Sequence, residues 1–494
     1  MSQRFWILDF RFWIASMLIV AFVAVASVKG QIPSPGTARS VSIPAVKETT
    51  LKNGLKVAVV EKPGVPIVTA QLLVKAGANS EAIEKAGVAN MTAEMLTKGT
   101  KTRTAEQIAE EIEFFGASIN SGAGWNSSSV TISVTSDKLD QAMAIMADVV
   151  LNPSFTQAEL NLLKAQTLDE LKANLTQPAF LANYAATRFT FGEHPANGTS
   201  SSIPSLSVAD LRSFYERQFL ANDAVLILTG DINQTKAVSL AERLFGGWKG
   251  SAEKDQNRFS SGPSGPAEGK SIVGRILVID LPGAGQASVN FYRPIRAIGR
   301  SSTEYYPAAV LNSLLGGGYS SRLNQEIRIK RGLSYGAGSG FGWRSASANF
   351  STRTQTKNQS AAEVTELVIA ELKRLAETSA AETELNPRRL VLTGGFGRNL
   401  ETTGGLTAAL ADLYSFGVPT GELNKYMSSV AAVSPANIKD FASRHLHDGD
   451  IIIVGDYSIF KDDLAKRFPN MKIDIVKADD LDIDSATLRK SDVQ

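Results

Sequence analysis

GGGYSSRLNQEIRIKRGLSYGAGSG, the stretch Gly316–Gly340, sets the pattern for the second half of this chain. A glycine break comes first, and then a helical run that is expected to stop at Gly332. A small-residue segment follows, in which we expect a strand to start at Tyr335. Arg328 near the helix end and Tyr335 at the strand start are expected to converge on one point, bringing together a guanidinium and a phenol.

A similar order of glycine-rich segments and apolar runs occurs earlier in the chain, which indicates an internal repeat. GLSYGAGSGFGWRSASANFSTRT in the second half resembles GASINSGAGWNSSSVTISVTS in the first, with Trp343 at the place of Trp125. Likewise, the glycine of Gly455-Asp456 follows a buried apolar run, as does that of Gly230-Asp231. These similarities recur at an offset of roughly 220 to 230 residues, as expected for a duplicated unit of domain size.

Each repeat mixes antiparallel strand runs with pairs of helices, which is typical of an α+β fold. A helix start is marked by Thr104, with Gln107 three residues on, as in a capping box. We therefore predict two homologous α+β halves joined by a Gly/Pro/Ser linker. The predicted segments are a signal peptide (1–26), a flexible lead-in (27–45), a first half (46–259), a linker (260–270), a second half (271–478) and a polar tail (479–494).

The start of the chain has the features of an export signal. Arg4 and Arg11 precede an apolar run, and Ala24-Val25-Ala26 offers a small-x-small cleavage site. The apolar run is short for a membrane-spanning helix. An uncleaved membrane anchor remains the alternative, and either reading predicts an exported, periplasmic protein.

Composition excludes several classes of function. The chain has 494 residues, a net charge of +2 and no cysteine. The absence of cysteine rules out disulfides, thiolate metal sites and a cysteine nucleophile. The near-neutral charge, without a clustered basic stripe, gives no indication of nucleic-acid binding.

AGVANMTAEMLTKGT (86–100), GASIN, the closing FYERQF…GDI and RLNQEIRIKRGLSY occur here in one order. With these motifs the chain resembles the pitrilysin and mitochondrial-processing-peptidase family of inverted zinc peptidases, from about Val46 to Val476. The resemblance implies a clamshell of two α+β halves that enclose a peptide chamber.

The catalytic helix of that family carries His-x-x-Glu-His, in which the histidines bind Zn²⁺ and the glutamate is the general base. In this chain, Asn90 and Glu94 stand in place of the histidines, and Ala93 replaces the base. By the resemblance, Glu170 is retained at the position of the third ligand. We therefore expect no cofactor in this chain, although a hard-cation site at Glu94 and Glu170 remains an alternative to two ordinary helix carboxylates.

No other set of residues offers a convincing catalytic centre. The three histidines are His194, His445 and His447. His194 is alone in its loop, and His445 and His447 have strand-like spacing, so we expect structural or surface roles. A Gly-x-Ser-x-Gly elbow is absent, and the glycines before Tyr319 lack the lysine of a phosphate loop.

In the family, the second half contributes an arginine and a tyrosine, seven positions apart, that reach the bound substrate. Arg328 and Tyr335 have this spacing and this sequence context. Both are good donors to a peptide carbonyl and to the oxyanion formed from it. The segment Gly336–Gly340 is expected to lie beside an extended peptide by strand addition, or else in a tightly packed sheet.

The resemblance and the lost motif together predict a non-catalytic, substrate-binding subunit of a heterodimeric zinc peptidase. Arg328 and Tyr335 are its expected substrate-binding residues, and a homologous partner subunit is expected to bring the zinc. We expect the chain to be inactive alone. One alternative is a non-enzymatic scaffold or core-type assembly subunit, and another is a self-sufficient metallopeptidase with an atypical metal site.

Overall fold

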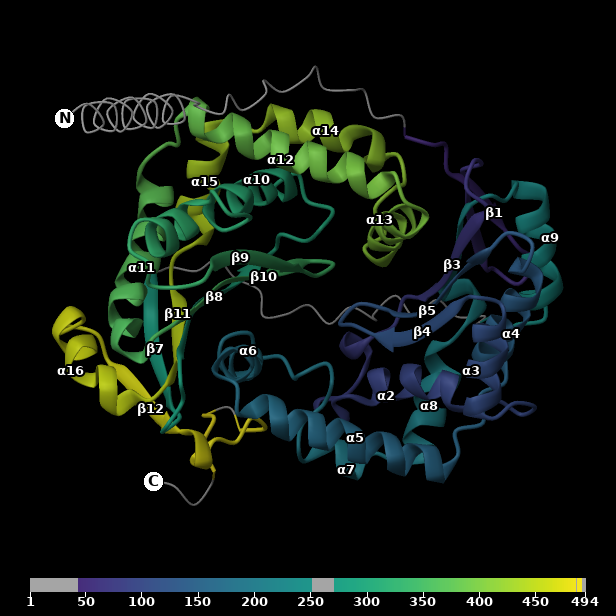
Figure 1. The fold of residues 1–494 in the computed structure, drawn as a ribbon, viewed down its shortest axis with the longest axis horizontal. Coiled ribbons are helices and arrows are strands. Elements are labelled where there is room, and N and C mark those ends of the chain that lie inside the picture. Colours follow the sequence, from purple (N-terminus) through teal and green to yellow (C-terminus); the bar gives the residue numbers. More distant parts are fainter. Residues whose placement is uncertain (1–42, 251–270, 486, 491–494) are drawn as a thin grey trace, which may run out of the picture. The chain divides into compact units, whose positions relative to one another are not determined.

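The computed structural model describes residues 43–250, 271–485 and 487–490 (Figure 1). The predicted signal peptide, most of the predicted lead-in and the predicted linker (260–270) lie outside the described residues. No helix in these ranges is both long and apolar enough to cross a membrane.

The first half is built on a six-stranded sheet with the order β1–β2–β6–β3–β5–β4. Strand β6 runs parallel to β2 and antiparallel to β3. All seven residues of β6 are buried, because it lies inside the sheet and reads as a continuous run of small and apolar side chains. The strands are β1 (Lys47–Thr50), β2 (Lys56–Glu61), β3 (Ile67–Val74), β4 (Ser118–Ala123), β5 (Ser128–Thr135) and β6 (Ala224–Gly230).

The second half repeats this sheet with the order β12–β7–β11–β8–β10–β9. Here too the central strand, β11, is parallel to one neighbour, β7, and antiparallel to the other, β8. The two sheets differ only in the edge strand beside β2 or β7. In the first sheet this strand, β1, comes before the other strands in sequence, and in the second sheet it is β12, which comes after them. The strands are β7 (Val273–Asp280), β8 (Ala287–Arg296), β9 (Ala337–Trp343), β10 (Ser347–Thr356), β11 (Gly449–Gly455) and β12 (Ile473–Lys477). The predicted pair of homologous α+β halves is confirmed.

Helices accompany each sheet in matching order. In the first half these are α2 (Val88–Met95), α3 (Ala105–Phe114), α4 (Leu139–Leu151), α5 (Gln157–Leu175), α6 (Pro178–Phe189), α7 (Ser202–Ser205), α8 (Val208–Gln218) and α9 (Gln234–Phe245). Helix α3 starts with the predicted capping box of Thr104 and Gln107.

The second half has α10 (Tyr305–Leu315), a π-helical segment (Asn324–Ile329), α11 (Ala361–Glu377), α12 (Glu382–Leu400), α13 (Thr403–Ser415), α14 (Glu422–Ala432), α15 (Pro435–His445) and α16 (Tyr457–Arg467). Short 3-10 turns occur at Ala78–Ser80, Ile83–Lys85, Leu96–Lys98, Ala221–Asp223, Asn358–Ser360 and Ala478–Asp480.

The two halves exchange one helix each. Helix α13 of the second half packs on β3 and β6 of the first sheet, where Thr69 Oγ1 donates to Thr403 Oγ1 at 2.9 Å. Helix α6 of the first half packs on β8 and β11 of the second sheet, where the Tyr292 hydroxyl donates to Asn183 Oδ1 at 2.9 Å. Each sheet is therefore covered in part by the other half.

Part of the predicted polar tail (479–494) is ordered against the fold, in residues 481–485 and 487–490. Leu481 forms an isolated bridge with Arg489, and Ile483 and Leu488 are 6% and 0% exposed. Both apolar side chains join the core cluster that contains α6 and β12 residues. Burial of this apolar surface is what orders the segment.

Candidate functional site

The segment that carries Arg328 ends as its sequence predicts. The Gly332 N–H donates to the Arg328 carbonyl, and the Leu333 N–H donates to the Ile327 carbonyl, each at 2.9 Å. Gly332 has a φ of +63°, a left-handed conformation that glycine adopts without the steric cost of a Cβ. This glycine turn closes the π-helical segment and leads the chain directly towards Tyr335.

The predicted strand start at Tyr335 is wrong by two residues, because β9 begins at Ala337. Ser334 Oγ donates to the Gly336 carbonyl at 2.7 Å and accepts from the Gly336 N–H at 3.1 Å. This local turn keeps Tyr335 out of the strand ladder. The Tyr335 side chain projects instead into solvent, at 89% exposure.

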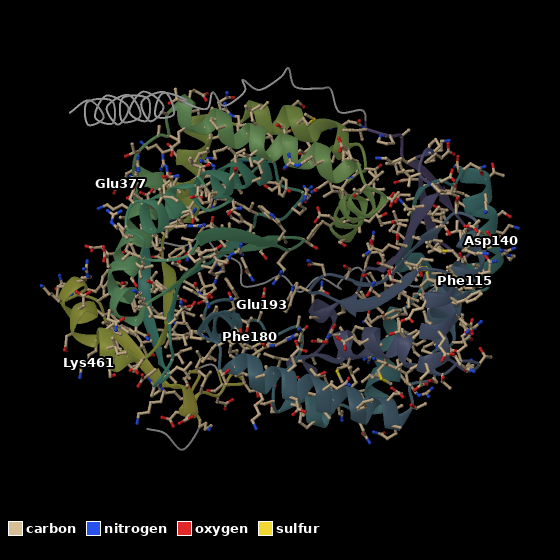
Figure 2. All side chains as sticks on the ribbon, viewed as in Figure 1. Phe115, Asp140, Phe180, Glu193, Glu377 and Lys461 are labelled. Carbon is tan, nitrogen blue, oxygen red and sulfur yellow. The ribbon has the colours of Figure 1, made fainter. Side chains whose placement is uncertain are left out.

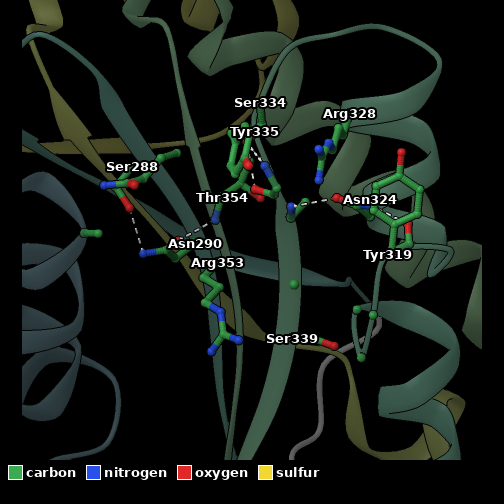
Figure 3. Close-up of a pocket in the computed structure, with 18 of the residues that line it drawn as sticks. Ser288, Asn290, Tyr319, Asn324, Arg328, Ser334, Tyr335, Ser339, Arg353 and Thr354 are labelled. Carbon is green, nitrogen blue, oxygen red and sulfur yellow. Dashed lines mark hydrogen bonds between the residues drawn. The ribbon is translucent and has the colours of Figure 1, made fainter. Parts of the chain in front are cut away.

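Arg328 and Tyr335 nevertheless converge, as expected. The guanidinium carbon of Arg328 lies 4.7 Å from the centre of the Tyr335 ring and 4.9 Å from that of Tyr319 (Figure 3). The sequence did not single out Tyr319 as part of the site, because a tyrosine after a glycine run has no distinctive spacing. Two ring faces therefore hold the guanidinium by cation–π contacts.

Arg328 has no carboxylate partner among the described residues, although acidic groups are close in sequence. Glu326, two positions earlier, pairs with Lys330 and with Arg331. The rings restrict the Arg328 side chain without occupying its hydrogen-bond donors. Its N–H groups thus remain available to a ligand.

Arg328 and Tyr335 line a cavity of about 870 Å³. Its walls come from the glycine loop at Gly316–Gly318, from strands β8, β9 and β10, and from the start of α6. A Cβ on Gly316 would lie 2.2 Å from the Ser339 nitrogen, so only glycine lets this loop approach β9 so closely.

Strand β9 is the edge strand of the second sheet, the position that strand addition requires. Two of its N–H groups on the open side are already bonded. The Ala337 N–H donates to Asn324 Oδ1 and the Ser339 N–H to the Gly316 carbonyl, both at 3.3 Å. Over Ala337–Ser339 the structure therefore agrees with the tightly packed alternative.

In the first half, Asn90, Ala93 and Glu94 all lie on α2, where the resemblance places the catalytic motif. Asn90 Nδ2 donates to Glu94 Oε1 at 2.8 Å, and Asn90 Oδ1 accepts from the Ala123 N–H at 3.2 Å. The Ala93 carbonyl accepts from Ser121 Oγ at 2.5 Å. These bonds join α2 to β4, so the Asn90 amide is committed to structure.

Glu170 lies exposed on α5, one turn after Thr167, whose hydroxyl faces Met91 of α2 at 3.9 Å. In the part of the chain that the structure describes, no three His, Cys, Asp or Glu residues are grouped to hold a metal ion. The side chains at the motif positions supply no imidazole, and zinc prefers nitrogen and sulfur ligands. These residues do not fit a zinc ion.

His194 is not alone, contrary to its sequence context. It is buried, with Nδ1 3.5 Å from Glu81 Oε1 and its ring 5.3 Å from that of Trp125. The Glu81 carboxyl oxygens accept from the Gly87 and Ala89 N–H groups at 2.8 and 2.7 Å, which satisfies two N–H groups at the start of α2. Burial raises the pKa of Glu81 to about 8, against the opposing effect of these two bonds.

The surroundings of Trp125 also bind the two halves together. The Arg344 guanidinium lies 4.7 Å from the Trp125 ring and pairs at 2.8 Å with Glu193. Glu193 is labelled in Figure 2. Trp125 lies two residues after β4 and Trp343 is the last residue of β9, so both stand at the end of the first strand of a hairpin, in agreement with their predicted correspondence.

The predicted strand-like spacing of His445 and His447 is wrong, because His445 is the last residue of α15 and β11 starts at Gly449. His445 Nε2 lies 3.2 Å from Glu304, and His447 Nδ1 lies 3.6 Å from Asp448. Both histidines therefore have neighbours typical of structural positions.

Comparison with known proteins agrees with this architecture. The family profile described as insulinase (peptidase family M16) matches residues 56–197, and the profile described as peptidase M16 inactive domain matches residues 205–388. A protein of Rickettsia felis described as an uncharacterized zinc protease is 30% identical over 296 residues, covering 58% of this chain and 68% of the relative. This chain belongs to the M16 peptidase family.

Two solved structures share the fold. A Pseudomonas fluorescens structure described as a peptidase M16 inactive domain has a TM-score of 0.74 and 25% identity, covering 83% of this chain and 98% of the other. A Helicobacter pylori protease structure has a TM-score of 0.76 at 20% identity, covering 84% and 100%. A Helicobacter pylori protein described as a non-peptidase homolog is 24% identical over 361 residues, covering 72% and 80%.

Proposed function

We propose that this M16 chain is the non-catalytic, substrate-binding subunit of a heterodimeric, exported zinc peptidase. The observation that carries the proposal is the contrast between the two halves. Asn90 and Glu94 are bonded to each other where the family has zinc ligands, whereas Arg328 and Tyr335 stand together at a cavity with their donors available. The matches to a domain described as inactive and to a non-peptidase homolog support a non-catalytic role.

In the proposed complex, Arg328 and Tyr335 hold the carbonyl of a bound peptide. Both donate to the carbonyl oxygen, and their hydrogen bonds strengthen as negative charge develops there. The aromatic rings beside Arg328 keep its guanidinium oriented before the peptide arrives, which lowers the cost of ordering it on binding. The homologous partner subunit supplies the zinc.

Co-expression with a homologous subunit that carries His-x-x-Glu-His tests the proposal. We expect the two chains to co-purify and to cleave a fluorogenic peptide. Arg328→Ala and Tyr335→Phe should each lower kcat/KM by about 10²–10³-fold, the cost of losing one oxyanion donor. Lys330→Ala, an exposed change in the same segment, is the matched control and should leave turnover unchanged.

Each other outcome contradicts the proposal in a recognisable way. No association and no activity would exclude a heterodimeric peptidase. A stable complex whose kcat/KM is unchanged by both substitutions would favour the scaffold alternative. Peptide cleavage by this chain alone, abolished by a chelator, would favour a self-sufficient metallopeptidase.

The proposed site of action is the periplasm, on the basis of the predicted export signal at residues 1–26. Cell fractionation and N-terminal sequencing check this point. Recovery in the periplasmic fraction with a mature start after Ala26 is expected, and recovery in the cytoplasm with Met1 retained would contradict it.

A further inference from the structure

The charged side chains that line the cavity beside Arg328 and Tyr335 are all positive. Two arginines, Arg328 and Arg353, are among its described lining residues, and no aspartate or glutamate is. The rest of the lining is glycine, alanine, tyrosine and neutral polar side chains. Neither arginine forms an ion pair within the described parts of the chain. The cavity therefore carries positive charge that its own walls do not neutralise.

Arg353 lies beside the glycine opposite it on the edge strand. It lies on β10, in register with Gly338 of β9. Its Nε and Nη2 atoms are 3.4 and 3.7 Å from the place that a Cβ on Gly338 would occupy. These are ordinary van der Waals distances, so the Arg353 guanidinium lies directly against Gly338 at the edge strand.

A buried polar network lies next to Arg353 (Figure 3). Asn290 is 1% exposed, and its Nδ2 donates to Ser288 Oγ at 3.1 Å and to the Tyr292 hydroxyl at 2.9 Å. Its Oδ1 accepts from the Thr354 N–H at 3.2 Å. These bonds use the amide groups of Asn290, whereas Arg353 beside it has no ion-pair partner among the described residues and is the charged group here that can bind a ligand.

We propose that Arg353 forms a subsite for the carboxylate side chain of an acidic peptide, whose backbone is held by Arg328 and Tyr335. The inference deepens the proposed function and rests on it. A guanidinium matches a carboxylate in a bidentate geometry, whereas a lysine or arginine of the peptide would meet two unpaired positive charges.

The register gives the spacing along the peptide. Gly338, opposite Arg353, is three residues beyond Tyr335 on the same segment. Because the chain turns at Ser334, these three residues span at most about 10 Å, so an extended peptide would place its acidic residue within about three positions of the held carbonyl.

Binding of end-capped peptides to the purified full chain tests the subsite without any catalytic readout. In a glutamate scan along a neutral decapeptide, measured by fluorescence anisotropy at low salt, one position should bind about tenfold tighter than its glutamine analogue. Arg353→Ala should abolish that preference, and Arg353→Glu should transfer it to a lysine peptide. Arg217→Ala, which removes an exposed arginine of α8, is matched in charge and should keep the preference.

The outcomes separate this inference from the proposed function. If glutamate and glutamine peptides bind equally and both weaken in Arg328→Ala, the acidic subsite is overturned and the peptide-holding role stands. If the glutamate preference depends on Arg353 but peptide affinity is unchanged by Arg328→Ala and Tyr335→Phe, the subsite stands and the proposed function fails. Binding of no peptide by the chain overturns both.

Discussion

Glu81 has an environment that its sequence context does not suggest. Its side chain has no exposed surface, and both of its oxygens accept backbone N–H groups at the start of α2. His194, more than a hundred residues later, supplies the other polar group beside it. The sequence could not pair these two residues, because the loops that carry them meet only in the folded chain.

The raised pKa of Glu81 predicts that stability falls as pH rises. Burial raises the folded-state pKa to about 8, above the unfolded value, so between these values the folded state binds the extra proton. The stabilisation is complete below about pH 4.5 and is lost as pH rises through about 8. Burial lowers the pKa of His194, whose effect has the opposite sign and lies below about pH 6.5.

Urea unfolding between pH 6.5 and 8 therefore isolates Glu81. The free energy of unfolding of the wild type should decline with pH, by at most about 1.4 kcal/mol per unit, and Glu81→Gln should flatten the decline. Glu84→Gln, an exposed glutamate nearby, is the control and should keep the wild-type slope. Equal slopes for wild type and Glu81→Gln would show that the Glu81 carboxyl does not titrate in this range.

In the segment Asn324–Gly340, some structural features follow from the local sequence and others appear only in the folded structure. The glycine stop at Gly332 is a local signal, and the structure has it where the sequence predicts. The π-helical form was not predicted, because apolar spacing over six residues does not separate it from an α-helix. Tyr335 lies outside the strand because the hydrogen bond from Ser334 Oγ to the Gly336 carbonyl forms a turn in place of strand pairing.

Replacement of Gly332 tests this element. Gly332→Ala places a Cβ at a φ of +63° and should lower the free energy of unfolding by about 1–2 kcal/mol. Because the same turn orients Arg328, peptide binding should weaken as well. Gly318→Ala is the matched control for stability, since its added Cβ would meet no atom within 4 Å and its φ is not left-handed. Equal destabilisation by both changes would contradict the role of the turn.

For the molecule as a whole, the exchange of α6 and α13 links the stability of the two halves. Leu181 and Ala185 of α6 are buried in one cluster with Ile452 and Val454 of the second sheet. Thr229 of the first sheet donates through its hydroxyl to the Thr403 carbonyl of α13 at 2.9 Å. A half on its own would leave the apolar face of its sheet open to water.

Separate expression of the halves tests this dependence. Residues 43–250 and 271–490 should each be aggregation-prone alone, and co-expression should yield a soluble complex with a single cooperative unfolding transition. Size-exclusion chromatography and circular dichroism would report the result. Two monomeric halves that each unfold cooperatively would show that the exchanged helices add little to stability.

The sequence by itself determined the duplicated α+β architecture, the glycine-terminated segment around Arg328 and the loss of His-x-x-Glu-His at Asn90–Glu94. These features depend on local periodicity, on turn residues and on identities at fixed spacing, which a chain carries before it folds. Tertiary structure alone decided that Tyr319 completes the contacts of Arg328, that His194 lies beside Glu81 and that Arg353 opens onto the same cavity. Those contacts join residues from separate loops and elements, so their free energy is gained only when the half that carries them has folded.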